Sequence, residues 1–170
     1  MRKPESETAR RRRRRRRRIQ IIIIYTAIAV GLAWFFESQA TTTVIFVRHA
    51  EKAAMPADDP GLSPAGERRV AELTRQLVDA DVVAGVDAVY STAYRRTVET
   101  AQAVADALDL PVNTYDVADT EAIMERIVKD HKGKIILVVG HSNTLPALIG
   151  NMGASKRVPV IAEDEYDNIY

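Results

Sequence analysis

Two of the three histidines in this 170-residue chain stand directly after short β-prone runs, at positions where a side chain could do chemistry. His49 follows Thr43–Val47 and Arg48, and His141 follows the apolar run Ile135–Val139. In an open α/β sheet this position is the crevice outside the carboxyl ends of the strands, where ligands bind. The guanidinium beside the first histidine favours an anionic ligand, above all a phosphoryl group.

Phosphoryl transfer is the reaction that suits these residue types. A neutral imidazole is a good nucleophile toward phosphorus near pH 7, so a histidine can take a phosphoryl group and later lose it to water. The transferred group carries charge on three equatorial oxygens, so catalysis consists largely of positioning and stabilisation by cations. This chemistry needs no metal, and the sequence shows no clustered Asp/His pattern that would hold one. We therefore expect no cofactor.

The scaffold for these side chains is predicted from alternating β-prone and helix-period runs after Thr41. Strands are predicted over residues 42–47, 86–90, 111–115 and 135–139, with 158–161 and 168–170 as further edge strands. Helices are predicted from Ser63-Pro64 (N-cap and first position), over 93–108, around 123–133 and from about 144. The order βαβαβαβα predicts an α/β fold, a three-layer sandwich with a mainly parallel sheet.

Four segments at the ends of these elements resemble the histidine phosphatase superfamily, also called phosphoglycerate-mutase-like. They are Val47–Glu51, Leu62–Glu67, Ser91–Ala101 and Gly140–His141. The resemblance covers nearly everything after Thr41. It is nearest to the small bacterial phosphohistidine phosphatases, which also lack large insertions. It implies a phosphoglycerate-mutase-like fold and a metal-independent phosphoric monoester hydrolase that acts on phosphomonoesters or other phosphoryl compounds.

The resemblance also assigns roles to individual side chains. It implies that His49 is the nucleophile and that Arg48, Arg96 and His141 bind and stabilise the phosphoryl group. Ser142, directly after the second histidine, is a further expected substrate contact. The substrate would be a phosphorylated small molecule or a phosphoprotein.

The sequence differs from the family pattern at the residue that would donate a proton to the leaving group. Protonation of an alkyl leaving oxygen is worth roughly 10²–10⁴ in rate. Family members usually supply the acid after the third strand or directly after the second histidine, where this chain has Ser142-Asn143. Asp116, the carboxyl nearest the end of the third predicted strand, is the expected donor here. If it does not serve, phosphohistidine and acyl or aryl phosphates become the favoured substrates.

Other readings of the domain stay open. A fold that keeps the pocket but lacks an effective acid would be a catalytically weak or inactive phosphate-binding or scaffold module. A mutase is less favoured, because the chain has no capping insertion. The remaining histidine, His131, lies in a polar helix end and is expected to face solvent, and Arg95 is expected to face solvent or an acidic neighbour.

The first forty residues have a different composition. Up to residue 36 the chain carries eleven Lys and Arg against two Glu, including the unbroken run Arg10–Arg18. The next segment, Ile19–Phe36, has no charged residue. As a helix its length would be roughly 27 Å, close to the ~30 Å of a membrane core. The aromatic residues Trp34–Phe36 at its far end suit a membrane interface.

These features predict a single-pass inner-membrane protein. We expect a cytoplasmic Arg-rich tail over 1–18, a transmembrane anchor over 19–36, and a histidine phosphatase domain over 41–170 in the periplasm or outside the cell. A cleaved signal peptide is the alternative, since Ser38 and Ala40 are small residues before Thr41, although its apolar segment would be unusually long. Because the arginine run adjoins the apolar segment, we expect membrane topology and no nucleic-acid binding.

Overall fold

The computed structural model describes residues 7–38, 40–79, 85–153 and 160–170, which fall into two compact units, Met1–Ala40 and Thr41–Tyr170. The first unit contains helix α1 (Glu7–Ser38), which includes the whole predicted apolar segment. The helix is long enough and contains a sufficiently apolar stretch to cross a membrane. All the side chains described in this helix, over residues 10–38, are exposed.

The second unit is built around a parallel sheet. Its strands are β1 (Thr43–Arg48), β2 (Ala88–Thr92), β3 (Val112–Tyr115) and β4 (Ile135–Gly140), in the spatial order β1-β4-β2-β3. Its helices are α2 (Pro64–Asp79), α3 (Arg95–Ala107), α4 (Thr120–Asp130) and α5 (Leu145–Asn151). All three strand pairs are parallel.

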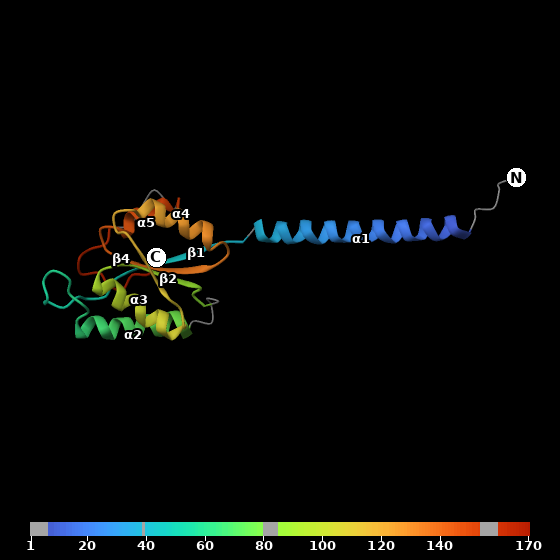
Figure 1. Cartoon of the computed structure of the whole chain (residues 1–170). Coiled ribbons are helices and arrows are strands. Elements are labelled where there is room, and N and C mark those ends of the chain that lie inside the picture. The colour runs from blue at the N-terminus through green and yellow to red at the C-terminus, as the bar shows by residue number, and fades with distance from the viewer. Residues whose placement is uncertain (1–6, 39, 80–84, 154–159) are drawn as a thin grey trace. The chain divides into compact units, whose positions relative to one another are not determined.

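The strand order explains how the helices divide between the two faces. The connections through α2 and α3 step across the sheet in one direction, and the connection through α4 steps back to insert β4 beside β1. Parallel crossovers are almost always right-handed, so helices on opposite steps cover opposite faces. Figure 1 shows α2 and α3 below the sheet and α4 and α5 above it. The predicted three-layer α/β sandwich with a mainly parallel sheet is confirmed.

The core is two apolar layers, one on each face. Alternation along β4 sends Ile136 and Val138 to the layer under α4 and α5, and Leu137 and Val139 to the layer over α2 and α3. All four of these side chains are fully buried. A continuous aliphatic run is what a strand covered on both faces requires.

Several element boundaries differ from the prediction. Strand β2 begins at Ala88 instead of residue 86, since the Asp87 carboxylate accepts hydrogen bonds from Ile135 N (2.8 Å) and Lys134 Nζ (2.9 Å). Of the predicted edge strand 158–161, residues 158–159 lie outside the described part, and Ile161 is core-packed coil. The last predicted edge strand is reduced to one antiparallel bridge, Ile169 to Val47.

The start of α2 is fixed by a close approach to the loop after β1. Ser63 caps the helix as predicted, since its Oγ accepts from Gly66 N at 3.1 Å. A Cβ on Gly66 would lie 2.3 Å from the carbonyl oxygen of Glu51, a backbone atom that also accepts from Ser63 N. This glycine therefore lets the helix lie against the segment that follows the first histidine.

Gly66→Ala is expected to lower the free energy of unfolding by about 2–3 kcal/mol, because neither backbone can move aside without strain. Gly85→Ala is the matched control, since nothing lies within 4 Å of a Cβ there. Thermal unfolding of the full chain followed by circular dichroism measures both variants. Equal midpoints for the two variants would contradict the steric argument.

Candidate active site

The two strand-end histidines lie side by side because β1 and β4 are neighbours in the sheet. Arg48 pairs with Gly140 in the strand register, so the residue after each strand emerges at the same edge. His49 N donates to Gly140 O at 3.0 Å. The rings of His49 and His141 have centroids 5.3 Å apart at an interplanar angle of 67°. The expected histidine pair is thus brought together at the carboxyl edge of the sheet.

The hydrogen bonds of His49 define which ring nitrogen can react. Nδ1 lies 2.8 Å from the carbonyl oxygen of Ala50, which can only accept, so Nδ1 carries the proton. Nε2 therefore keeps its lone pair, and it accepts from Arg96 Nε at 3.2 Å. With the residue 5% exposed, this leaves one ring nitrogen with a free lone pair, next to an arginine.

Both histidines are held in the neutral form. Burial lowers the pKa of His49 to about 4, the positive charges of Arg96 and Arg48 and the nearness of the titratable ring of His141 act in the same direction, and the hydrogen bond to Ala50 O opposes them. Burial also lowers the pKa of His141 to about 4, again helped by the two arginines. A neutral imidazole keeps the lone pair that attack on phosphorus requires.

The pH dependence of hydrolysis should reflect this. Because protonation of His49 removes the nucleophile and its pKa is about 4, kcat/KM should hold its neutral-pH value down to about pH 5 and fall below that. A histidine at the ordinary pKa of about 6.5 would already have lost about tenfold at pH 5.5. The measurement is a kcat/KM profile from pH 3.5 to 8, corrected for the substrate's own ionisation. An acidic limb near 6.5 would contradict the buried neutral nucleophile.

Helix α3 positions Arg96 against His49. The backbone N of Ala50 donates to Thr100 Oγ1 at 3.1 Å, and Thr100 Oγ1 donates to the carbonyl of Arg96 at 2.7 Å, so one threonine joins the loop after β1 to this helix. The Arg96 side chain is 17% exposed and lies 3.9 Å from an Asp59 oxygen. The guanidinium is also stacked on Tyr94, 4.6 Å from the ring centroid.

His141 is held by the hydroxyl groups of two threonines and by the ring of a tyrosine. Its Nε2 lies 3.0 Å from Thr92 Oγ1, which lies 2.7 Å from Thr97 Oγ1. The ring of Tyr94 meets the imidazole edge to face, with centroids 5.2 Å apart. These contacts fix the orientation of the His141 ring.

Arg48 reaches the same edge of the sheet but is held by the C-terminal part of the domain. Its Nη1 donates to the carbonyl oxygens of Ala162 (2.8 Å), Glu163 (2.9 Å) and Glu165 (2.9 Å). The Tyr166 ring lies over its guanidinium, with the centroid 4.1 Å from Cζ. The charges of Arg48 and Arg96 act on both histidines, so the four predicted residues Arg48, His49, Arg96 and His141 converge at this edge of the sheet.

Among the described residues, neither Asp116 nor Ser142 hydrogen-bonds through its side chain to Arg48, His49, Arg96 or His141. Asp116 is exposed in the turn after β3, where its Oδ1 accepts from Ala118 N at 2.9 Å. Ser142 is half-buried next to His141. No carboxylate hydrogen-bonds to either histidine ring within the described parts of the chain. The role of Asp116 as proton donor stays a prediction.

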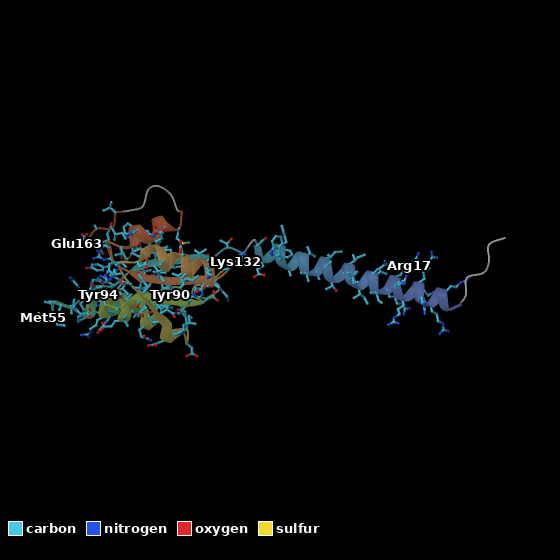
Figure 2. The ribbon with its side chains drawn as sticks, turned by 45° about the horizontal axis from the view of Figure 1, so that its top comes forward. Arg17, Met55, Tyr90, Tyr94, Lys132 and Glu163 are labelled. Atoms are coloured by element: carbon cyan, nitrogen blue, oxygen red, sulfur yellow. The ribbon has the colours of Figure 1, made fainter. Side chains whose placement is uncertain are left out.

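The third histidine contradicts its predicted solvent exposure. His131 is half-buried, and its Nε2 lies 2.8 Å from the hydroxyl of Tyr90. It lies near the amino ends of the strands, the end where Figure 2 places Lys132, opposite to Tyr94 and Glu163. The packing partner was missed since Tyr90 is 41 positions away in sequence. Arg95 behaves as expected, exposed and paired with Glu99 at 3.1 Å.

The structure adds residues that the sequence analysis did not single out. They are Asp59, Thr92, Tyr94, Thr97, Thr100 and Tyr166. For Thr92 a usable signal existed, because a residue shortly after the predicted strand 86–90 lies at the same edge of a parallel sheet as the histidines. Tyr166 had no such signal, since it belongs to no helix or strand. Among the residues described, no group of three or more His, Asp, Glu or Cys could hold a metal ion.

Comparisons with known proteins agree with this geometry. Residues 44–119 match the family model of the histidine phosphatase superfamily (branch 1). The structure of the protein histidine phosphatase SixA complexed with tungstate is 22% identical, with a TM-score of 0.53 over 63% of this chain and 74% of that chain. Bacillus stearothermophilus YhfR is 20% identical, with a TM-score of 0.54 over 71% and 82% of the two chains.

A more distant relative has the same fold. A phosphoserine phosphatase variant from Entamoeba histolytica, in complex with phosphoserine, is 16% identical, with a TM-score of 0.51 over 65% of this chain and 79% of that chain. At these identities the structural matches show the fold. Comparison with curated protein sequences gives no match.

Proposed function

We propose that this domain, which belongs to the histidine phosphatase superfamily, is a phosphatase that hydrolyses phosphoryl compounds through a phosphohistidine on His49. One observation carries the proposal. The Nδ1 proton of His49 is committed to Ala50 O, so the lone pair of Nε2 is left beside the guanidinium of Arg96. A buried, neutral nucleophile next to a cation is the arrangement that attack on a phosphoryl group requires.

The reaction divides into two displacements. In the first, Nε2 of His49 forms a bond to phosphorus while the bond from phosphorus to the leaving group breaks, and the leaving group departs with that electron pair. In the second, water attacks phosphorus, the N–P bond breaks, and inorganic phosphate and the neutral histidine are regenerated. Arg96, Arg48 and His141 stabilise the equatorial oxygens in both steps, and Ser142 is a further substrate contact.

The leaving group decides which phosphoryl compounds are good substrates. Asp116 is exposed and turned into its own loop through Ala118 N. With no acid held against the histidines in the described residues, leaving groups that depart without prior protonation react fastest. Acyl and aryl phosphates have such leaving groups, and phosphohistidine loses a neutral imidazole when its other ring nitrogen carries a proton taken from water, so the substrate is a phosphoprotein or small molecule of that kind. Asp116 then assists only with simple alkyl phosphates.

Trapping the intermediate tests the proposal directly. The full chain is mixed with a ³²P-labelled acyl phosphate, quenched in base within milliseconds, and digested to locate the label. The expected label is acid-labile, stable to base, and lies on His49. If no phosphoenzyme forms and labelled oxyanion still binds, the domain is the alternative phosphate-binding module and not an enzyme.

We also propose that helix α1 anchors the domain in the inner membrane, with the arginine run in the cytoplasm and the domain in the periplasm or outside the cell. Support comes from the length and apolarity of the helix and from the positive-inside rule. Reporter proteins active only inside or only outside the cytoplasm, fused after Tyr170, test this. Reporter activity in the cytoplasm would overturn the orientation.

A further inference from the structure

The segment Ala162–Tyr166, called the strap below, crosses the proposed active site between two fixed points. Before it, Ile161 is 7% exposed and packs in the core layer under α4 and α5. After it, Tyr170 exchanges two backbone hydrogen bonds with Phe46 of β1, at 2.8 and 3.0 Å. A segment pinned at both ends has a defined path across the intervening residues.

The strap holds one side of the Arg48 guanidinium. Three of its carbonyl oxygens accept from Nη1 at 2.8–2.9 Å, and Tyr166 stacks on the guanidinium plane. Arg48 is 9% exposed, so these contacts are made largely out of water. Carbonyl acceptors and an aromatic face together satisfy the charge without neutralising it.

The other edge of the guanidinium, formed by Nε and Nη2, makes no hydrogen bond to the strap. The strap's hydrogen bonds all go to Nη1, and Arg48 Nε is buried with no hydrogen-bond partner among the described residues. A buried N–H left without a partner is costly, and an oxyanion bound across Nε and Nη2 would satisfy it. The strap thus occupies Nη1 and leaves the Nε and Nη2 edge of Arg48 without a hydrogen bond to the strap.

We propose that the strap sets the oxyanion-binding orientation of Arg48, with Tyr166 as its positioning residue; this rests on the proposed function. The Tyr166 ring also lies 6.2 Å from the ring of His49, so one side chain borders both the cation and the nucleophile. The strap comes from the far end of the chain and belongs to no helix or strand of the domain. It therefore contributes to the site without being part of the four motif segments.

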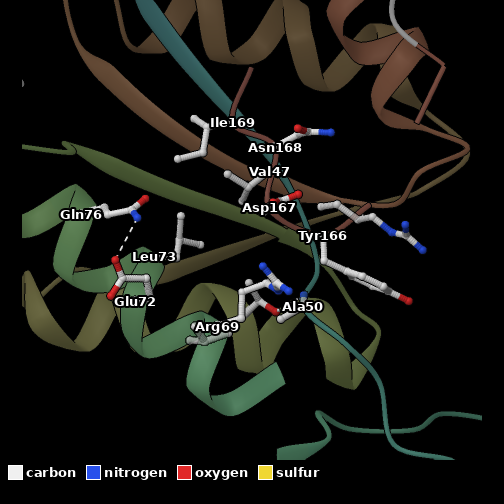
Figure 3. A pocket seen from close by; sticks show the side chains of 13 residues that line it. Val47, Ala50, Arg69, Glu72, Leu73, Gln76, Tyr166, Asp167, Asn168 and Ile169 are labelled. Carbon is white, nitrogen blue, oxygen red and sulfur yellow. Dashed lines mark hydrogen bonds between the residues drawn. The ribbon is translucent and has the colours of Figure 1, made fainter. Parts of the chain in front are cut away.

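A cavity lies beside the ring of Tyr166, whose ring contacts within the described residues are the guanidinium of Arg48 and the ring of His49. Figure 3 shows this cavity, of about 70 Å³, between Tyr166–Ile169 on one side and Arg69, Leu73 and Gln76 of α2 on the other. The ring is half-buried. Because the cavity lies between Tyr166 and α2, we expect removal of the ring to act on the guanidinium 4.1 Å away more than on the packing of this helix.

The test is tungstate binding by the full chain, measured by calorimetry so that turnover is not required. Tyr166→Leu is expected to weaken tungstate binding about tenfold, since it removes the aromatic face. Tyr166→Phe keeps that face and is expected to stay within about twofold of the unchanged protein. Thermal unfolding of each variant is recorded alongside, and both midpoints should stay near that of the unchanged protein.

A double-variant comparison separates positioning of Arg48 from a general effect on the fold. In the Arg48→Ala background, Tyr166→Leu should cause no further loss of tungstate affinity, because the group that it positions is gone. Independent, additive losses would overturn the proposal, as would equal affinity of Tyr166→Leu and the unchanged protein. If the variants show the expected, non-additive losses but the unchanged protein forms no phosphoenzyme, the proposed hydrolysis fails and the role of the strap stands.

Discussion

His49→Ala is expected to lower the turnover of an aryl or acyl phosphate by about 10⁴-fold or more and to abolish the phosphoenzyme. The replacement removes Nε2, the ring nitrogen that carries the free lone pair because Nδ1 donates its proton to Ala50 O. The remaining cations, Arg48, Arg96 and His141, would still bind an oxyanion. The variant should therefore lose kcat while tungstate binding changes little, and stopped assays together with calorimetry measure the two effects separately.

His131→Ala is the matched control for this loss. It removes an imidazole that is likewise hydrogen-bonded, but that is half-buried and contacts Tyr90 near the opposite ends of the strands. Its turnover should stay within about twofold of the unchanged protein, with any change confined to stability. Comparable losses in both variants would mean that His49 acts through the fold, and the nucleophile would have to be sought elsewhere.

The parts of the site that sequence reasoning could predict are those that lie at strand ends. A residue directly after a buried strand of a parallel sheet must emerge at the carboxyl edge, which placed Arg48, His49 and His141 together. Arg96 needed the family resemblance, because nothing in its local pattern separates it from Arg95. The structure does separate them, since one guanidinium is 17% exposed at His49 and the other pairs with Glu99 on the surface.

The parts that escaped prediction depend on contacts far apart in sequence. The insertion of β4 between β1 and β2 depends on tertiary pairing, and no local pattern in Ile135–Val139 specifies its neighbours. The same holds for Tyr166, whose partner Arg48 lies more than a hundred positions earlier. Irregular segments lack the periodicity that marks helices and strands, so only the folded chain shows that this one reaches the site.

The two adjacent arginines allow the sharpest test of the cationic half of the mechanism. Arg96→Ala is expected to lower kcat/KM by about 10²–10³-fold, as for the loss of one oxyanion donor in other enzymes. Its Nε stands 3.2 Å from the nucleophilic nitrogen, next to the position of a transferred phosphoryl group. Arg95→Ala removes the same side chain one position earlier, where it is 56% exposed and paired with Glu99, and should change kcat/KM less than twofold. Steady-state kinetics on one aryl phosphate decides between them. If Arg95→Ala causes the larger loss of kcat/KM, Arg95 and not Arg96 is the second phosphate-binding arginine. The contact between Arg96 and His49 would then have no role in catalysis.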